Sequence, residues 1–164
     1  MKTQNAVLIK NIFITLAFAS GLIIASNITI PFFPVPFTLQ TLMLLIAIFY
    51  DVKIAFKSTL LYIFLGCIGL PVFANFENAY LIALHPYAGY LIGFIAGVAL
   101  ACYLEPKNLL NKILLFYAGL FGIGVPYLAF FVGLHEAIVG GFVFFILPET
   151  LKSILAYTIY RYIR

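Results

Sequence analysis

An acid and a base lie three residues apart near the end of this chain, in the segment LPETLK (147–152). Residues at i and i+3 face the same side of a helix, so Glu149 and Lys152 can pair. Ionisable side chains within an apolar membrane segment are costly and indicate a functional site. A carboxylate that accepts N–H groups, beside an ammonium that donates, would suit a small polar ligand. The alternative is a structural ion pair at the membrane interface, with the lysine head directed to water.

Other polar residues indicate chemistry less clearly. The segment NFENAY (75–80) has the composition of a solvated loop, and His85 precedes an apolar run, where packing or capping is its ordinary role. His135-Glu136 resembles the start of the zinc-binding pattern HExxH, but the second histidine is missing. We therefore expect no metal site.

A phosphate-binding loop is also not expected. Lys57-Ser58-Thr59 matches the end of such a loop, but Phe56 precedes it and no glycine run comes before. Without those glycines the backbone cannot enclose phosphate groups. We therefore expect no nucleotide site and no cofactor in this chain.

The composition tells where these residues must lie. Hydrophobic residues make up 65% of the 164 residues and charged residues 9%, whereas soluble domains are about half apolar and a quarter charged. The chain is thus an integral membrane protein, and its long unbroken apolar runs favour helices over a β-barrel. We predict an all-α fold in one domain, residues 1–164. It has six transmembrane helices at about 11–30, 37–50, 54–72, 80–104, 109–131 and 137–160.

The basic residues predict the topology, because Lys and Arg concentrate in cytoplasmic loops. If the N-terminus is cytoplasmic, eight of the nine basic residues lie on the cytoplasmic side, Lys152 is the exception, and both termini are cytoplasmic. The eight residues are Lys2, Lys10, Lys53, Lys57, Lys107, Lys112, Arg161 and Arg164. The net charge of +4 is therefore a topology signal, and no nucleic-acid partner is expected.

Prolines indicate where the membrane helices are incomplete. The segment PFFPVPF (31–37) holds three prolines and cannot form a regular helix. The span that follows it, and the span after Pro148, would be about 21 Å and 18 Å long, against a hydrocarbon core of about 30 Å. Both shortfalls lie on the outer side. They predict an outward-facing ligand pocket roofed by extracellular loops, with the phenylalanines of 31–37 covering the ligand.

Small residues recur every four positions in the first span, at Ala17, Gly21 and Ala25. Such a strip lets another helix approach closely. Packing within the chain and docking of another membrane subunit both remain open at this point.

The segment PVPFTLQTL (34–42) resembles a block of the BioY family, the biotin-specific substrate-binding (S) components of energy-coupling factor (ECF) transporters. Three further blocks follow in the family's order: GCIGLPVF (66–73), PYAGYLIGF (86–94) and LPETLK (147–152). The family patterns read roughly PVPITLQTL, GLIGLPVF, PTGGYLIGF and PGDLLK. Four blocks in matching order and spacing extend over nearly the whole chain, so the resemblance is strong.

The resemblance implies a six-helix fold in which loops after the first, third and fifth helices roof an outward biotin pocket. It implies three partners besides the lipid bilayer: biotin, a membrane scaffold (T) subunit, and a pair of cytoplasmic ATPase subunits that hydrolyse ATP. The strip of Ala17, Gly21 and Ala25 then faces the scaffold subunit.

The family motifs also place ligand-binding residues in this sequence: Glu149, Lys152, Asn75, Tyr90, Thr38 and Gln40. Glu149 would accept the ureido N–H groups of biotin, and Lys152 would donate to a ligand oxygen that the sequence does not identify. Two departures bear on the ligand. Glu149 stands where the family has Asp, and Tyr87-Ala88 replaces Thr-Gly, so the pocket can be tuned to a relative of biotin.

The resulting prediction is a carrier and not an enzyme: high-affinity biotin binding and uptake across a prokaryotic cytoplasmic membrane. The rivals are an autonomous transporter or channel, a carrier for a biotin-related molecule, and an intramembrane enzyme. A channel should show polar residues through several spans, whereas polar density here lies at the outer ends. An enzyme needs a nucleophile or metal set within one membrane layer, and the sequence gives no such set.

Overall fold

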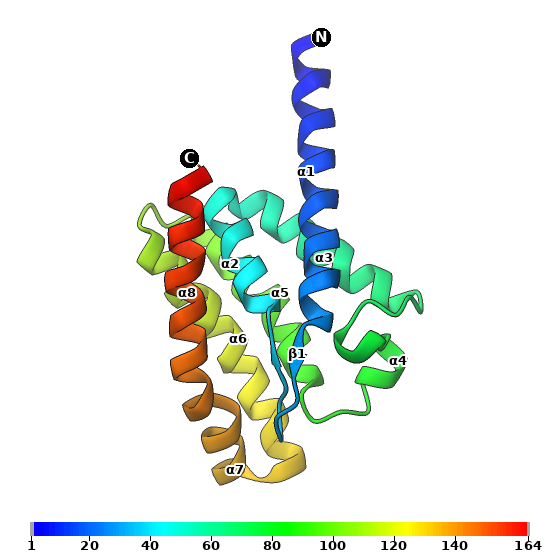
Figure 1. Cartoon of the computed structure of the whole chain (residues 1–164), viewed down its shortest axis with the longest axis vertical. Helices are drawn as coiled ribbons and strands as arrows, with labels where there is room; N and C mark the ends of the chain where they lie inside the picture. The colour runs from blue at the N-terminus through cyan, green and yellow to red at the C-terminus, as the bar shows by residue number, and fades with distance from the viewer. Residues whose placement is uncertain (1, 164) are drawn as a thin grey trace.

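The computed structural model describes residues 2–163, so Arg164, one of the residues used for the topology prediction, lies outside the described residues. The described chain is mostly helical, and Figure 1 shows both ends of the chain at the same end of the molecule. The elements are α1 (Lys2–Asn27), β1 (Thr29–Ile30), β2 (Phe37–Thr38), α2 (Gln40–Tyr50), α3 (Val52–Cys67), η1 (Ala74–Phe76), α4 (Ala79–Ile82), α5 (Ala88–Leu104), α6 (Leu109–Val132), α7 (Leu134–Ile138), η2 (Val139–Val143) and α8 (Phe144–Ile163).

Among the described residues, three helices are long and apolar enough to cross a membrane: Gln4–Asn27, Leu109–Val132 and Leu134–Tyr162, the last of which joins α7, η2 and α8. The chain is therefore a multi-pass membrane protein. The other predicted spans contain shorter helices, with 11 residues in α2, 16 in α3 and 17 in α5. The count of six spans stays a prediction.

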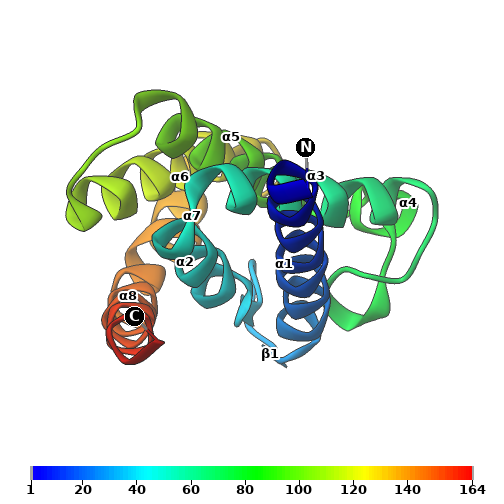
Figure 2. The same ribbon diagram turned by 90° about the horizontal axis from the view of Figure 1, so that it is seen from above.

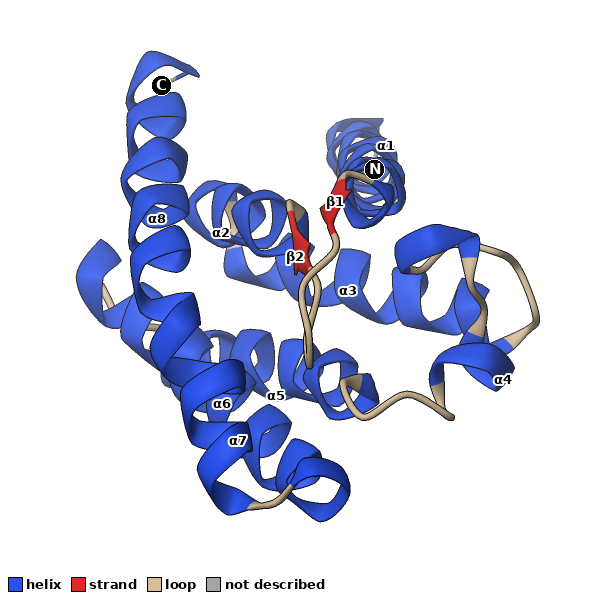
Figure 3. Cartoon of the chain, turned by 60° about the horizontal axis from the view of Figure 1, so that its bottom comes forward, coloured by secondary structure: helices blue, strands red, loops and turns tan. Residues whose placement is uncertain are grey.

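The short span after the proline segment is confirmed. α2 has 11 residues, about 16 Å of helix. The chain reaches it through an antiparallel hairpin in which Thr29 pairs with Thr38 and Ile30 with Phe37. Figure 3 shows this hairpin in the middle of the molecule, with helices on either side. Residues 31–36, with their three prolines, form the hairpin connection.

The predicted break before Glu149 is wrong. α8 begins at Phe144 and passes through Pro148, and it continues from α7 through the π-helical turn η2. Pro148 has no N–H to donate to the carbonyl four residues earlier. Membrane helices tolerate that loss where neighbouring groups and local π-helical adjustments satisfy the backbone. Glu149 therefore lies inside a long helix and not at its start.

α5 and α6 pack closely on each other at glycine positions, and Figure 2 shows the two helices as neighbours at one edge of the molecule. A β-carbon on Gly93 would lie 2.6 Å from the carbonyl oxygen of Leu120. A β-carbon on Gly119 would meet the backbone of Gly97. Larger residues would push the helices apart, because these contacts are with backbone atoms. This helix pair forms the wall that carries the aromatic residues of the site.

Candidate ligand-binding site

Polar residues of α2 and α8 meet aromatic residues of α5 and α6 at one cavity, which we call the inner cavity. Four predicted ligand residues line it: Thr38, Gln40, Tyr90 and Glu149. The other lining residues are Val35, Pro36, Thr41, Ala74, Ile82, Tyr87, Leu91, Phe94, Leu120, Phe121 and Phe145. The cavity thus combines a polar end with mainly apolar walls, the usual character of a small-molecule site.

Glu149 and Lys152 form the ion pair that their spacing predicts. Lys152 Nζ lies 2.6 Å from Glu149 Oε1, and Glu149 is only 4% exposed. Nζ also donates to the carbonyl oxygen of Thr38 at 2.7 Å and to Thr41 Oγ1 at 3.0 Å. All three donors of the ammonium are therefore used. Lys152 ties α8 to β2 and α2, and a ligand oxygen reaches it only by replacing one of these partners.

Tyr117 holds the second carboxylate oxygen of Glu149, and Ser153 contacts Tyr117. The Tyr117 hydroxyl donates to Glu149 Oε2 at 3.0 Å and lies 3.0 Å from Ser153 Oγ. Ser153 Oγ donates to the backbone carbonyl of Glu149 at 2.8 Å. A carboxylate has about four acceptor positions, so Glu149 can still accept N–H groups from a ligand. Sequence reasoning missed Tyr117, although the i+4 spacing of Ser153 from Glu149 could have indicated the serine.

Gln40 is held in place by two neighbours. Its Nε2 donates to the hydroxyl of Tyr62 at 2.6 Å, and its Oε1 accepts from Thr38 Oγ1 at 2.8 Å. Tyr62 comes from α3 and is almost fully buried. These bonds leave one N–H of the Gln40 amide for a further acceptor. Sequence reasoning did not find Tyr62, which has no motif to mark it.

Tyr90 provides part of the aromatic wall, with its hydroxyl donating to the carbonyl oxygen of Gly141 at 2.8 Å. Its ring occupies the space beside Gly124, where a β-carbon would lie 2.6 Å from the ring. Phe145 stacks on it with ring centroids 6.5 Å apart. Aromatic faces of this kind offer a flat apolar surface to a ring-shaped ligand. Phe94, Phe121 and Phe145, which also line the cavity, were not predicted as site residues.

The proline segment reaches the cavity through Val35 and Pro36 and not through its phenylalanines. Phe33 is 79% exposed. Phe32 packs against Phe37 and Phe144 beside the cavity. None of the three phenylalanines of this segment lines the cavity in this structure, and their covering of a bound ligand stays a prediction. The physical reason is that the connection turns at buried Pro34, which packs on Gly140 and directs Val35 inward.

Asn75 lies outside the cavity lining. It is exposed in the loop after Ala74, and its Oδ1 lies 3.5 Å from Thr29 Oγ1. Ala74, directly before it, does line the cavity. The structure therefore places Asn75 next to the site without bringing its amide into it.

The small residues of α1 have three different surroundings. Ala17 is exposed, and Ala25 is buried. A β-carbon on Gly21 would collide with Met43 of α2. Gly21 and Ala25 thus pack within the chain, and Ala17 is the member of the strip that stays on the surface. Docking of another subunit on the strip stays a prediction.

The inner cavity has a volume of about 50 Å³. One water needs about 10–15 Å³ on this measure, so the cavity holds a few waters. Sites that enclose drug-sized ligands have volumes of about 300–1,000 Å³. A ligand larger than a few waters can enter only when a lining element moves.

Comparison with known proteins gives a consistent relationship. The model of the BioY family matches residues 1–164. The chain is 33% identical over 147 residues to the probable biotin transporter BioY of Rickettsia prowazekii, covering 85% of this chain and 76% of that protein. It is 33% identical over 149 residues to the biotin transporter BioY of Thermotoga maritima, covering 85% and 86%.

A solved structure has the same fold. It is described as the S-component for biotin from an ECF-type ABC transporter, and it matches with a TM-score of 0.80 at 22% identity, covering 98% of this chain and 93% of that chain. The fold, the full-length family match and the two relatives above 30% identity agree with the four sequence blocks and with the Glu149–Lys152 pair inside the last block. This chain belongs to the BioY family.

Proposed function

We propose that this protein binds biotin and carries it across the cytoplasmic membrane as the S component of an ECF-type transporter. The observation that carries the proposal is the inner cavity itself. The carboxylate of Glu149 and the amide of Gln40 line it beside the aromatic rings of Tyr90, Phe94 and Phe121, and the ammonium of Lys152 is paired with that carboxylate. Biotin has the matching chemistry, with ureido N–H donors, ligand oxygens and an apolar bicycle. The relatives named above are biotin transporters.

In this proposal the polar residues read the ligand's hydrogen-bonding groups. Glu149 accepts ureido N–H groups at positions left free by Lys152 and Tyr117. Lys152 gives up its bond to Thr41 or to the Thr38 carbonyl and donates to a ligand oxygen instead. Thr38 and Gln40 supply further polar contacts, and Tyr90 flanks the bicycle. Because Lys152 holds β2, ligand binding at Nζ also acts on the hairpin.

Entry of the ligand requires the cavity to open, since its volume is about 50 Å³. We assign this movement to the two loops that line the cavity, residues 31–36 and the segment around Ala74. Movement of the second loop by one side chain's length would bring Asn75 to the ligand, because Ala74 already lines the cavity. Both loops lie on the outer side of the predicted topology, so the pocket opens outward.

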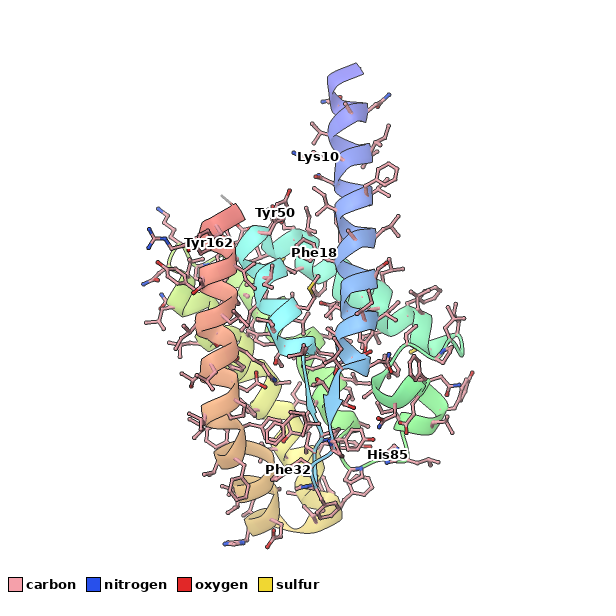
Figure 4. All side chains as sticks on the ribbon, in the orientation of Figure 1. Lys10, Phe18, Phe32, Tyr50, His85 and Tyr162 are labelled. Atoms are coloured by element: carbon pink, nitrogen blue, oxygen red, sulfur yellow. The ribbon has the colours of Figure 1, made fainter. Side chains whose placement is uncertain are left out.

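The proposed arrangement has six transmembrane helices in one domain, with both termini in the cytoplasm. This arrangement is supported by the positions of the basic residues in the sequence, of which all but Lys152 fall on the cytoplasmic side of the predicted topology. In Figure 4, Lys10 and Tyr162 lie toward the end of the molecule that carries both termini, whereas Phe32 and His85 lie toward the other end. The proposed partners are a T subunit and two ATPase subunits. We further propose that the chain is not an enzyme and holds no cofactor of its own.

A biotin-related molecule is the second candidate ligand, and one observation favours it. Tyr87 lines the inner cavity where the family pattern has Thr, and Glu149 is longer by one methylene than the usual Asp. Both differences take up volume at the site, so a smaller or differently shaped relative of biotin would fit.

Equilibrium binding to the purified protein tests the proposal, using biotin, biotin methyl ester and desthiobiotin. We expect tight binding of biotin and a measurable difference for the ester if the carboxylate is read. Absence of biotin binding by protein that melts cooperatively would overturn the assignment of biotin. Preferential binding of desthiobiotin would favour the second candidate.

A further inference from the structure

A second hollow lies on the other side of Glu149, between α6 and α8, and we call it the lateral groove. Its volume is about 950 Å³, and it opens onto the surface of the chain. α6 packs mainly on α5 and α8 mainly on α2, so neither of these two helices covers the other here. Apolar residues at helical spacing face the groove from both sides: Leu110, Leu114 and Phe121 on one side, and Phe142, Ile146 and Ile154 on the other.

Three polar side chains in the middle of the groove, Tyr117, Thr150 and Ser153, already have hydrogen-bond partners within the protein. The hydroxyls of Tyr117 and Ser153 bond to Glu149 and to each other. Thr150 Oγ1 donates to the carbonyl oxygen of Ile146 at 2.6 Å. The groove therefore offers an apolar surface along its length, which suits a hydrocarbon chain better than water or a polar solute.

Positive charge gathers at one end of this apolar surface. Lys107 lines the groove there, and an adjoining hollow that shares Leu109 and Tyr157 with it contains Arg161. Within residues 4–162, neither cation has an ion-pair partner. Glu105 is two residues from Lys107 in the sequence, but its carboxylate pairs with Lys53, whose Nζ lies 2.8 Å away. An apolar channel that ends in two unpaired cations is complementary to an amphiphile with a negative head.

The dimensions agree with one leaflet of a membrane. From Phe142 to Tyr157 the groove follows 16 residues of helix, which are 15 rises of 1.5 Å, or about 22 Å. Half of a hydrocarbon core is about 15 Å thick. An acyl chain of one leaflet can therefore lie in the groove, with the remaining length available to the headgroup region.

We propose that the lateral groove is a binding site for one anionic phospholipid. An acyl chain lies between α6 and α8, and the phosphate lies near Lys107 and Arg161. The site is independent of the proposed biotin site, from which it is separated by Glu149 and Phe121, the two residues that line both hollows.

The test uses native mass spectrometry of the full chain, released from detergent after addition of phosphatidylglycerol or phosphatidylcholine with identical acyl chains. We expect one phosphatidylglycerol to stay bound, with an affinity at least about tenfold higher than that of phosphatidylcholine, since each cation near the phosphate adds favourable energy. Equal retention of the two lipids by the native chain would overturn the proposal.

Paired variants locate the site. We expect the double variant Lys107→Gln/Arg161→Gln to lose the preference for phosphatidylglycerol. The control Lys10→Gln/Lys57→Gln removes the same charge from exposed positions outside the groove and should keep that preference. An equal loss in both pairs would mean non-specific attraction and would overturn the site. Leu114→Trp fills the groove without changing charge, and we expect it to reduce bound phosphatidylglycerol at least about fivefold.

A folding control accompanies each variant. Thermal melting in detergent must give a cooperative transition, and any variant that lacks one is replaced by Leu110→Trp, which also fills the groove from an exposed position. Undiminished lipid binding in a folded, groove-filled variant would overturn the proposal.

Discussion

The inner cavity and the lateral groove share Glu149, yet polar groups are arranged in opposite ways in the two hollows. Around the inner cavity, Thr38, Thr41 and Glu149 surround one small volume, and Lys152, which does not itself line the cavity, bonds to all three across different elements. Along the groove, the hydroxyls of Ser153 and Thr150 turn back onto their own helix, and the unpaired charges lie at one end. Convergent polarity suits a ligand with several hydrogen-bonding groups, whereas polarity at one end suits an amphiphile.

The comparison also separates two roles of one carboxylate. Oε1 of Glu149 accepts from Lys152 on the cavity side, and Oε2 accepts from Tyr117, which lines the groove. Changes on the two sides should therefore differ in their effect on biotin. A change of Lys152 removes bonds to three residues that line the cavity, Thr38, Thr41 and Glu149, whereas a change of Tyr117 acts only through Glu149.

The largest effect is expected for Lys152→Ala. Removing the ammonium leaves a carboxylate that is 4% exposed without its cation. Breaking a buried pair in this way costs about 3–5 kcal/mol, and loss of a partner in a binding site costs about 2–5 kcal/mol. We expect biotin affinity, measured by isothermal titration calorimetry on purified protein, to fall by about 2–5 kcal/mol.

Lys57→Ala is the matched control, because this lysine is exposed and lines neither hollow. Its biotin affinity should equal that of the native chain. An unchanged dissociation constant in folded Lys152→Ala protein would disprove the role given to the pair and would leave it as a structural ion pair.

A smaller effect is expected for Tyr117→Phe, which removes one hydroxyl and keeps the ring in the wall. Glu149 Oε2 then loses its donor, and an unsatisfied buried acceptor costs about 1–3 kcal/mol. We expect the dissociation constant for biotin to rise about tenfold. Tyr157→Phe, at the charged end of the groove, serves as control and should leave biotin binding unchanged. Equal effects of the two changes would disprove the role given to the hydrogen bond between Tyr117 and Glu149.

The sequence alone indicates several residues of the candidate site because they are close together in the chain and chemically unusual there. Glu149 and Lys152 are three positions apart in an apolar run, and Thr38 and Gln40 follow the proline segment directly. Their partners are different. Tyr117 lies 32 positions from Glu149, and Tyr62 lies 22 positions from Gln40. Tyrosines in apolar helices resemble ordinary packing residues, so only the packing of α3 and α6 reveals these two.

The prolines show that backbone structure, too, can be predicted only in part from the local sequence. Three prolines in the six residues 31–36 exclude a helix there, and the short α2 is predicted correctly. A single proline does not exclude a helix, and Pro148 lies inside α8 as Pro126 lies inside α6. Whether one missing N–H ends a membrane helix depends on neighbouring backbone and side chains, which the local sequence does not contain.

Asn75→Ala tests whether the outer loop closes on the ligand. The side chain is exposed and has one long contact, 3.5 Å to Thr29, but the backbone of Asn75 is left-handed with a φ of 58°, which asparagine tolerates better than alanine. We therefore expect a small loss of thermal stability. If the loop moves onto bound biotin, one lost hydrogen bond lowers affinity by about 1 kcal/mol. Asn78→Ala is the useful contrast, because Asn78 caps α4 by accepting from Tyr80 and Leu81. Its change should lower stability, and a loss of biotin affinity confined to Asn78→Ala would argue against contact with Asn75.

The smallest effect on biotin binding is expected for Ala17→Leu. This change lies on the surface of α1, away from the inner cavity and the lateral groove, and tests whether that surface docks another subunit. Ala17 is exposed, whereas Gly21 meets Met43 and Ala25 is buried. A bulky residue at Gly21 would therefore disturb α2 and confuse docking with folding, so Ala17 is the cleaner position. We expect Ala17→Leu to bind biotin within about twofold of the native chain. Uptake in cells that contain the T subunit and the ATPase subunits should fall severalfold, because added bulk prevents close helix contact.

The control for that experiment is Leu8→Phe, nine positions earlier and about half a turn away around α1. Leu8 is also exposed, so this change adds bulk on the opposite side of the same helix. Uptake by Leu8→Phe should stay normal if the docking surface is the face that carries Ala17. Normal uptake by a well-expressed Ala17→Leu chain would instead show that the small residues of α1 serve packing within the chain alone. The contact with Met43 and the burial of Ala25 already show this packing for two of the three.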